Sequence, residues 1–224
     1  MQHLSKKNNF IYLFFSLLIF LFSAAMIADF PDSLGEDILS GVILVMILVS
    51  IKSLRIDKSW RWALGILGFF FFAVVIFVKF FEHNFFVYII LSLLLIFFIG
   101  SFILTVKQVL FEGDIDGNKI IGSLSLYILL GLSWAVIYLF LLIIDPGAFS
   151  GIEVSNWQEG FSRVAYYSFV TLTTLGYGDI LPTRHITEFF VYLEAVTGVF
   201  YMAIIVSSLI ALRLEAIQKA RKEP

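Results

Sequence analysis

Hydrophobic residues occupy most of the chain in long runs, and short polar segments separate these runs. Six runs stand out, at residues 10–28, 38–54, 62–78, 84–106, 120–144 and 186–212. Because an α-helix rises 1.5 Å per residue, roughly 20 apolar residues cross a hydrocarbon core about 30 Å thick. The pattern therefore predicts six transmembrane helices. The second run has the shortest uncharged stretch, and it spans only if Lys52 extends its ammonium group to the lipid headgroups.

Composition agrees with an all-α integral membrane protein. Of the 224 residues, 60% are hydrophobic and 14% are charged, and a soluble domain could not bury that much apolar surface. A net charge of -2 does not have the strong basic balance that nucleic-acid binding needs, and the absence of cysteine removes disulfides and thiolate chemistry. The histidines are scattered at 3, 83 and 185 without a catalytic motif, so we expect neither an enzyme nor a cofactor.

The positions of the basic residues predict the orientation. All lysines and arginines except Lys79, Arg163 and Arg184 lie in the terminal segments, or in loops on the same side of the membrane as the termini. By the positive-inside rule, we expect a cell-membrane protein with both termini cytoplasmic and residues 145–185 extracellular. One alternative remains for the first run, which could be a signal peptide because Lys6 and Lys7 precede it and SAAMIAD ends it.

The segment between the last two runs is the most informative. It contains FSRVAYYSFVTLTTLGYGDILP, in which residues 161–173 have neither Gly nor Pro. These residues permit about three to four turns of helix, which is too short to cross the membrane. A short helix followed by a glycine-containing loop can enter the membrane and return when its backbone lines water or is buried in protein. The sequence predicts a re-entrant pore helix here.

Two glycines follow this helix, and they allow an unusual backbone. Gly176 and Gly178 can adopt positive φ, which lets consecutive carbonyl groups turn toward one axis. Several such segments around the axis would form rings of oxygens that replace the water shell of a cation. The hydroxyl of Thr174 could supply a further ring.

Residues 171–179, TLTTLGYGD, resemble the selectivity-filter signature of potassium channels, and residues 112–213 resemble the pore domain of that superfamily. The resemblance implies that K+ is bound by oxygens of Thr174, Leu175, Gly176 and Tyr177, with Gly178 and Asp179 at the outer mouth of the filter. Leu175 stands where valine is more usual. Tyr177 between the glycines favours K+ over Na+. One filter segment per chain implies a homotetramer in the lipid bilayer, with the pore on the fourfold axis.

Two aromatic residues occupy positions where many members of this family have tryptophans that brace the filter. We expect Tyr166 to be a hydrogen-bond partner of Asp179, and Tyr167 to contact Tyr177 of a neighbouring subunit. The alternative is that both tyrosines simply pack at the membrane interface.

The last run resembles the inner, pore-lining helix of these channels. Gly198 matches the place of a hinge glycine, although a small residue there could instead serve close helix packing. The residues that would line the cavity and gate, or face a neighbouring helix, are Val199, Met202, Val206 and Ile210. Glu194 is an acid inside the membrane, which we expect to be a protonated or hydrogen-bonded structural residue behind the pore helix, near Ser168 or Thr171, rather than a proton sensor.

The chain divides into two predicted domains. Residues 1–111 resemble a four-helix voltage-sensing domain, yet the run at 84–106 contains no charged residue to move in the field. Residues 112–224 form the pore domain and a short cytoplasmic tail. These features predict a six-helix K+ channel with little intrinsic voltage dependence. The alternative is a non-conducting or regulatory subunit that assembles with other pore-forming chains.

Overall fold

The computed structural model describes residues 9–27, 32–54, 58–80, 85–112, 117–152, 157–208, 210–211 and 214. Within these residues the regular secondary structure is helical apart from one short strand pair, in agreement with an all-α protein. The elements are α1 (Asn9–Ile27), α2 (Asp32–Ser53), α3 (Lys58–Phe80), α4 (Phe85–Val106), the π-helix η1 (Lys107–Phe111), α5 (Gly117–Ile144), β1 (Phe149–Ser150), α6 (Trp157–Leu172), β2 (Leu181–Pro182), α7 (His185–Phe200) and the π-helix η2 (Tyr201–Val206).

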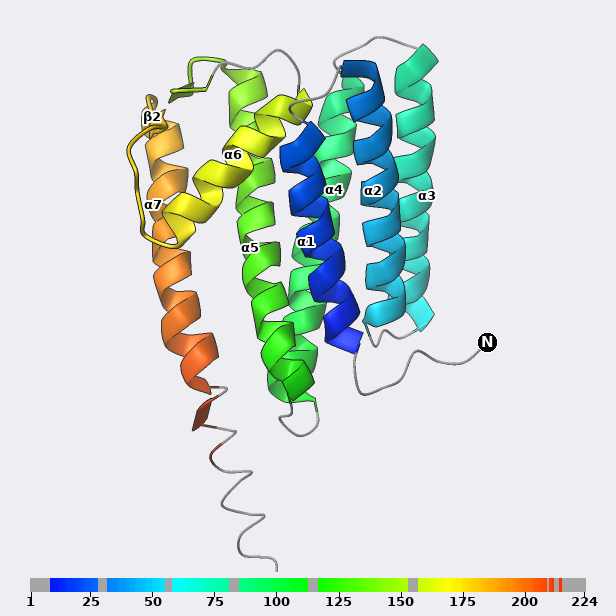
Figure 1. Cartoon of the computed structure of the whole chain (residues 1–224), viewed down its shortest axis with the longest axis vertical. Helices are drawn as coiled ribbons and strands as arrows, with labels where there is room; N and C mark the ends of the chain where they lie inside the picture. Colours follow the sequence, from blue (N-terminus) through cyan, green and yellow to red (C-terminus); the bar gives the residue numbers. More distant parts are fainter. Residues whose placement is uncertain are drawn as a thin grey trace, which may run out of the picture.

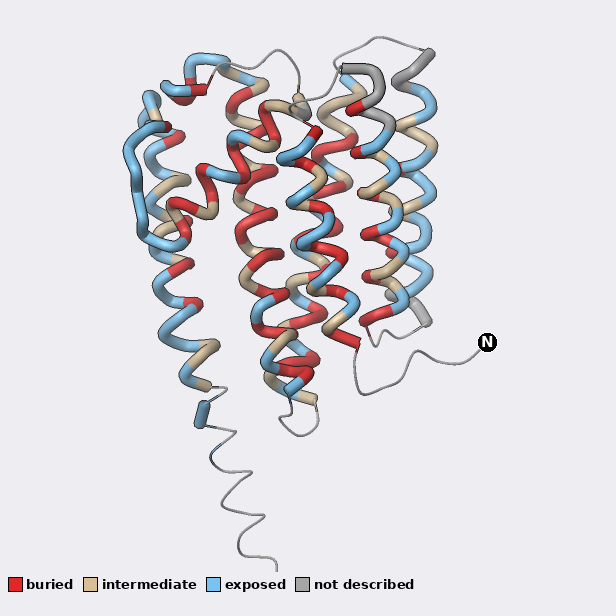
Figure 2. The backbone as a smooth tube through the Cα atoms, in the orientation of Figure 1, coloured by how far each residue is buried: buried red, intermediate tan, exposed pale blue. Residues whose placement is uncertain are grey.

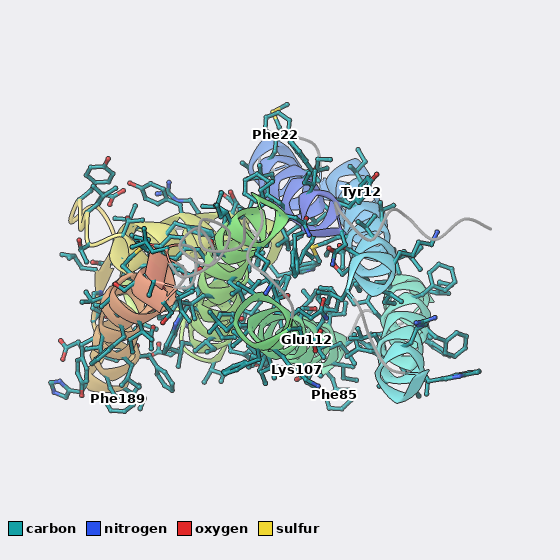
Figure 3. The ribbon with its side chains drawn as sticks, turned by 90° about the horizontal axis from the view of Figure 1, so that it is seen from below. Tyr12, Phe22, Phe85, Lys107, Glu112 and Phe189 are labelled. Atoms are coloured by element: carbon teal, nitrogen blue, oxygen red, sulfur yellow. The ribbon has the colours of Figure 1, made fainter. Side chains whose placement is uncertain are left out.

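The long helices stand side by side, and α6 crosses between α1 and α7 at a steep angle (Figure 1). Seen along the bundle, α7 lies at one end of an elongated cross-section and α3 at the other (Figure 3). Helix α1 packs against α2, α5 and α6, while α4 packs against α3 and α5. The helices before residue 112 therefore pack directly on the helices after it, and the predicted division into two domains stays a prediction.

Among the described residues, four helices are long and apolar enough to cross a membrane: Asn9–Ile27, Phe85–Phe111, Gly117–Ile144 and His185–Val206. The apolar parts of α2 and α3 are shorter, at Ile38–Ser53 and Arg61–Phe77. The structure thus supports a multi-pass membrane protein. The second and third of the six predicted spans stay predictions, and their weakness follows from charged residues at both ends of the two helices.

Helix α5 lies at the centre of the fold and has the most buried surface (Figure 2). Its neighbours contribute aromatic rings. Phe20 of α1 packs on Phe161 of α6 with ring centroids 5.4 Å apart, and Tyr88 of α4 stacks on Phe140 of α5 at 6.4 Å. Cleavage of α1 as a signal peptide would expose the faces of α2, α5 and α6 that it covers.

A polar network joins the start of α1 to the end of α2 and the start of α5. The Asn9 Nδ2 group donates to the Ser53 carbonyl at 3.0 Å, and the Ser53 hydroxyl donates to the Asn9 carbonyl. Asn118 Nδ2 donates to Asn9 Oδ1 at 2.7 Å, while its Oδ1 accepts from the Phe10 amide at 3.1 Å. These side chains are buried, so the network satisfies polar groups that would otherwise destabilise the fold.

Candidate functional site

The predicted pore helix is α6, which begins four residues before the glycine- and proline-free stretch that predicts it. It descends from the end of the bundle that carries β1 and β2, and the loop after it returns to that same end (Figure 1). The loop starts by folding back on the helix. The amides of Thr174 and Leu175 donate to the carbonyls of Thr171 and Val170 at 2.9 and 3.0 Å, respectively.

The sign of φ alternates along the loop backbone. Thr174, Gly176 and Gly178 have φ of 60°, 53° and 77°, whereas Leu175 and Tyr177 between them do not have positive φ. Such alternation turns successive carbonyls to one side and successive amides to the other. Within the described residues, no hydrogen bond uses the carbonyl oxygens of residues 174–177 as acceptors. The segment can therefore present a row of free oxygens.

The positive φ of Thr174 was not predicted from the sequence. Positive φ is rare for a β-branched residue and costs free energy, so it occurs where the surrounding structure enforces it, often at a functional site. The positive φ of both glycines follows from their lack of a side chain. For Thr174, the spacing was the only feature of the sequence that could have indicated positive φ. Thr174 lies two residues before Gly176, and Gly176 lies two residues before Gly178.

Residues 173–179 of the predicted filter segment are exposed in the single chain (Figure 2). Leu175 is 58% exposed and Tyr177 is 67% exposed. Exposure of these two large side chains to water would cost free energy. Their exposure leaves this segment free to be covered by other copies of the chain.

Tyr166 of α6 lies next to the outer end of the filter segment. A hydrogen-bonding interaction with the Asp179 carboxylate raises the pKa of the Tyr166 hydroxyl above its usual value, because ionising the phenol would place two negative charges together. The sequence led us to expect this pairing, and its role in bracing the filter stays a prediction.

Tyr167 belongs to a cluster within its own subunit. Its ring lies 5.4 Å from that of Tyr138 on α5 and 5.3 Å from that of Phe149 on β1, both edge to face. Only 6% of Tyr167 is exposed. Little of its surface is left for the neighbouring-subunit contact with Tyr177 that we expected, and that contact stays a prediction.

The outer end of the filter segment is fastened to the loop after α5. Strands β1 and β2 pair antiparallel, with Phe149 opposite Pro182 and Ser150 opposite Leu181. Gly151, with φ of 81°, allows the Asp179 carbonyl to approach, since a Cβ on Gly151 would lie 2.1 Å from that oxygen. The two strands thus fix the residues that follow the filter.

An ion pair closes the same region. Arg184 Nε donates to Asp145 Oδ2 at 2.7 Å, and the Gly147 amide donates to Asp145 Oδ1 at 2.9 Å. The hydrogen bond from Arg184, followed by that from the Gly147 amide, holds the pKa of Asp145 below its usual value. The same hydrogen bond to Asp145 raises the pKa of Arg184. Both side chains are substantially exposed, so solvent screens the pair.

Glu194 lies on α7 at the back of the pore helix, completely buried. The Tyr138 hydroxyl donates to its Oε2 at 2.5 Å, and its Oε1 lies 2.5 Å from the Ser168 hydroxyl oxygen. Ser168 and Thr171 were the predicted neighbours of this acid, and the structure places Ser168 beside it. Tyr138 is a partner that sequence reasoning missed, because only the packing of α5 reveals it.

Gly198 packs against the end of the pore helix. A Cβ at this position would lie 2.4 Å from the carbonyl oxygen of Leu172, the last residue of α6, and the Tyr127 hydroxyl donates to that oxygen at 3.1 Å. Close packing was the alternative that the sequence left open. The regular α-helix ends at Phe200, and η2 begins at Tyr201, so a hinge at Gly198 itself stays a prediction.

The predicted pore-lining residues do not form a uniform stripe. Val199, Met202 and Ile210 are exposed, whereas Val206 is half-buried and packs against the core. The reason is η2, because a π-helix has more residues per turn than an α-helix and rotates the positions after it. A stripe drawn at 3.6 residues per turn therefore does not continue through Tyr201–Val206.

A family model described as Ion channel matches residues 126–213. The match supports an ion-channel pore family. It begins within α5, includes α6 and the whole filter segment, and continues beyond η2. Comparisons with curated proteins and with solved structures gave no match. An ion channel also agrees with the apolar helices of a multi-pass membrane protein.

Proposed function

We propose that this protein is a K+-selective channel in which four copies of the segment from Thr174 to Gly178 surround one axis. The observation that carries the proposal is the alternation of φ at Thr174, Gly176 and Gly178, together with carbonyl oxygens that accept no hydrogen bond within the described residues. Rings of oxygens replace the water molecules that K+ loses when it enters the filter. They compensate the loss of hydration better for K+ than for Na+. The chain's own carbonyls are the ligands, so no cofactor is needed.

The tetramer follows from the same segment, since one chain supplies only one side of each oxygen ring. Helix α7 has a broad exposed apolar face that a neighbouring subunit can cover, and Phe189 on it points away from the bundle (Figure 3). Leu175 and Tyr177, which precede α7 in the chain, are also exposed and available for a neighbouring subunit to cover. In the assembled channel the membrane would contain six helices per subunit, with both termini cytoplasmic and β1 and β2 extracellular.

The channel conducts with little dependence on voltage. Helix α4 occupies the position of a sensor helix but contains no charged residue from Phe85 to Val106. Each elementary charge that crosses the membrane field contributes about 2.3 kcal/mol per 100 mV, so a helix without charge contributes none. Helices α1 and α4 instead pack on the helices of the proposed pore, and α2 and α3 pack on α1 and α4.

The decisive experiment is potassium flux into liposomes that contain only this purified protein. We expect K+ uptake that exceeds Na+ uptake and that is lost in Gly176→Ala, whose backbone needs positive φ. Absence of flux in protein that still forms tetramers would favour the alternative, a non-conducting or regulatory subunit. Absence of a four-subunit species after cross-linking would overturn the proposal.

A further inference from the structure

One buried polar cluster connects the three helices of the pore region. Glu194 of α7, Tyr138 of α5 and Ser168 of α6 meet behind the filter, and Glu194 and Ser168 are fully buried. The distances are 2.5 Å from the Tyr138 hydroxyl to Glu194 Oε2 and 2.5 Å from Ser168 Oγ to Glu194 Oε1. Ser168 Oγ also lies 2.8 Å from the carbonyl oxygen of Gly131 on α5.

The number of hydrogens in this cluster limits the charge of Glu194. A serine hydroxyl has one hydrogen to donate. Ser168 Oγ is within hydrogen-bonding distance of two oxygens, and the Gly131 carbonyl can only accept. If Ser168 donates to Gly131, then the short contact with Glu194 Oε1 needs a hydrogen from the carboxyl group. With an ionised Glu194, two oxygens without a hydrogen between them would face each other at one of these contacts.

The surroundings of Glu194 also disfavour a charge. Burial and the hydroxyls of Ser168 and Tyr138 act on this carboxyl group, and no basic side chain of the described residues is among the groups that do. A buried carboxylate without a cationic partner is costly, and in a membrane the cost is greater. A neutral acid avoids that cost and supplies the missing hydrogen.

We propose that Glu194 is held as the neutral acid and is a positioning residue for the filter, because it completes the chain Tyr138 to Glu194 to Ser168 to the Gly131 carbonyl. Each group in this chain donates one hydrogen to the next. The chain fastens α6 to α5 on one side and to α7 on the other. The protonation state of Glu194 is independent of the proposed function, whereas the effect of Glu194 on the filter rests on that function.

The position of Ser168 explains how this chain reaches the filter. Two residues later, the Val170 carbonyl accepts from the amides of Leu175 and Gly176 at 3.0 and 3.3 Å. A shift of α6 would therefore move the backbone that starts the filter. Glu194 does not touch the filter itself, so its influence acts through α6.

Infrared difference spectroscopy of the purified protein at pH 7 tests the protonation state directly. The wild-type spectrum minus that of Glu194→Gln should contain the carbonyl stretching band of a protonated carboxyl group. A difference spectrum with carboxylate bands alone would overturn the proposal. This measurement does not require conduction, so it decides the protonation even if the protein transports no K+.

Permeability of K+ relative to Na+ in liposomes tests the positioning role. In Glu194→Gln the amide group can donate to Ser168 and accept from Tyr138, so we expect a ratio close to wild type. Glu194→Leu and Ser168→Ala break the chain and should lower the ratio about tenfold, as the loss of a buried hydrogen bond implies. If Glu194→Leu does not fold, Ser168→Ala, which removes a single oxygen atom, decides the question.

Glu188→Gln is the matched control, because Glu188 lies on the same helix but is exposed and pairs with His185. Its ratio should equal that of wild type. An unchanged ratio in Ser168→Ala, or a lowered ratio in Glu194→Gln, would overturn the positioning role. If wild type has no flux while the protonated-carboxyl band is present, the proposed function fails and the neutral acid stands.

Discussion

The α-carbon of Gly198 faces the carbonyl oxygen of Leu172 so closely that a Cβ would lie 2.4 Å from that oxygen. Leu172 is the last residue of α6, and Thr173 already leads into the filter segment. Helices α7 and α6, the predicted inner and pore helices, therefore meet at a point where only glycine fits. This contact ties the conformation of α7 to the position of the predicted filter segment.

Replacing Gly198 by alanine should separate α7 from α6. The added methyl group meets backbone, which cannot rotate away, so we expect a destabilisation of about 1–3 kcal/mol and reduced K+ flux. Thermal unfolding in detergent measures the first effect. Gly100→Ala on α4 is the control, since nothing lies within 4 Å of its Cβ position. Equal unfolding temperatures for the two variants would contradict the contact.

Replacing Gly178 by alanine should impair conduction more than folding. Its φ of 77° is left-handed, and no neighbour within 4 Å obstructs a Cβ, so the cost is conformational. We expect about 1–2 kcal/mol of local strain, which changes the carbonyl directions. Liposome flux should be lost while detergent-solubilised tetramers persist. Gly65→Ala, at an open helical position, should conduct normally; full conduction by Gly178→Ala would argue against the backbone geometry.

Tyr166→Phe removes one hydroxyl and with it the interaction with Asp179. We expect a less stable filter, visible as faster loss of conduction during sustained K+ flux and as lower K+ over Na+ selectivity. Tyr12→Phe is a suitable control because Tyr12 projects from the outer face of α1 (Figure 3). Identical selectivity and decay in both variants would show that Tyr166 only packs at the interface.

The ion pair of Asp145 and Arg184 predicts a change with acidity. Because the folded pKa of Asp145 is lowered, the pair stabilises the fold above the unfolded value of about 4, and this stabilisation is lost as pH falls through the folded value. Asp145→Asn should unfold at a lower temperature than wild type at pH 7. The two curves should converge below about pH 3. A constant difference across this range would assign the effect to something other than the charge.

The current–voltage relation of the purified channel in symmetrical K+ should be nearly linear. Helix α4 has no charge to move between Phe85 and Val106. A steep sigmoid conductance curve would require several gating charges per subunit and would refute this prediction. Ile96 is an exposed residue of α4, and its replacement by arginine adds one charge to this helix. We expect this variant to show only slight voltage dependence, because a single charge contributes little gating energy.

Local rules of the chain explain why much of the site could be predicted. The lack of Gly and Pro before Thr174 indicated a short helix, and the two glycines after it indicated positive φ, because both depend on backbone sterics alone. Glu194 was expected behind the pore helix because a buried acid needs a polar partner, and few are available.

Other features depended on tertiary packing and could not be read from the chain. Tyr138 reaches Glu194 only because α5 packs against α7, 56 positions later. The hydrophobic pattern could not reveal η2, since an inserted residue changes the helical phase without changing composition. The pairing of β1 with β2 was also missed, because two-residue strands have no detectable period.

The buried pair of Asn9 and Asn118 places a requirement on biosynthesis. These residues are 109 positions apart, so α1 emerges from the ribosome long before α5 exists to donate the Asn118 amide to the side-chain oxygen of Asn9. Until then, Asn9 must find water, a headgroup or a temporary partner, and α1 cannot take its final place against α5. The hydrogen bond that fixes α1 against α5 therefore forms only after half of the chain has been translated.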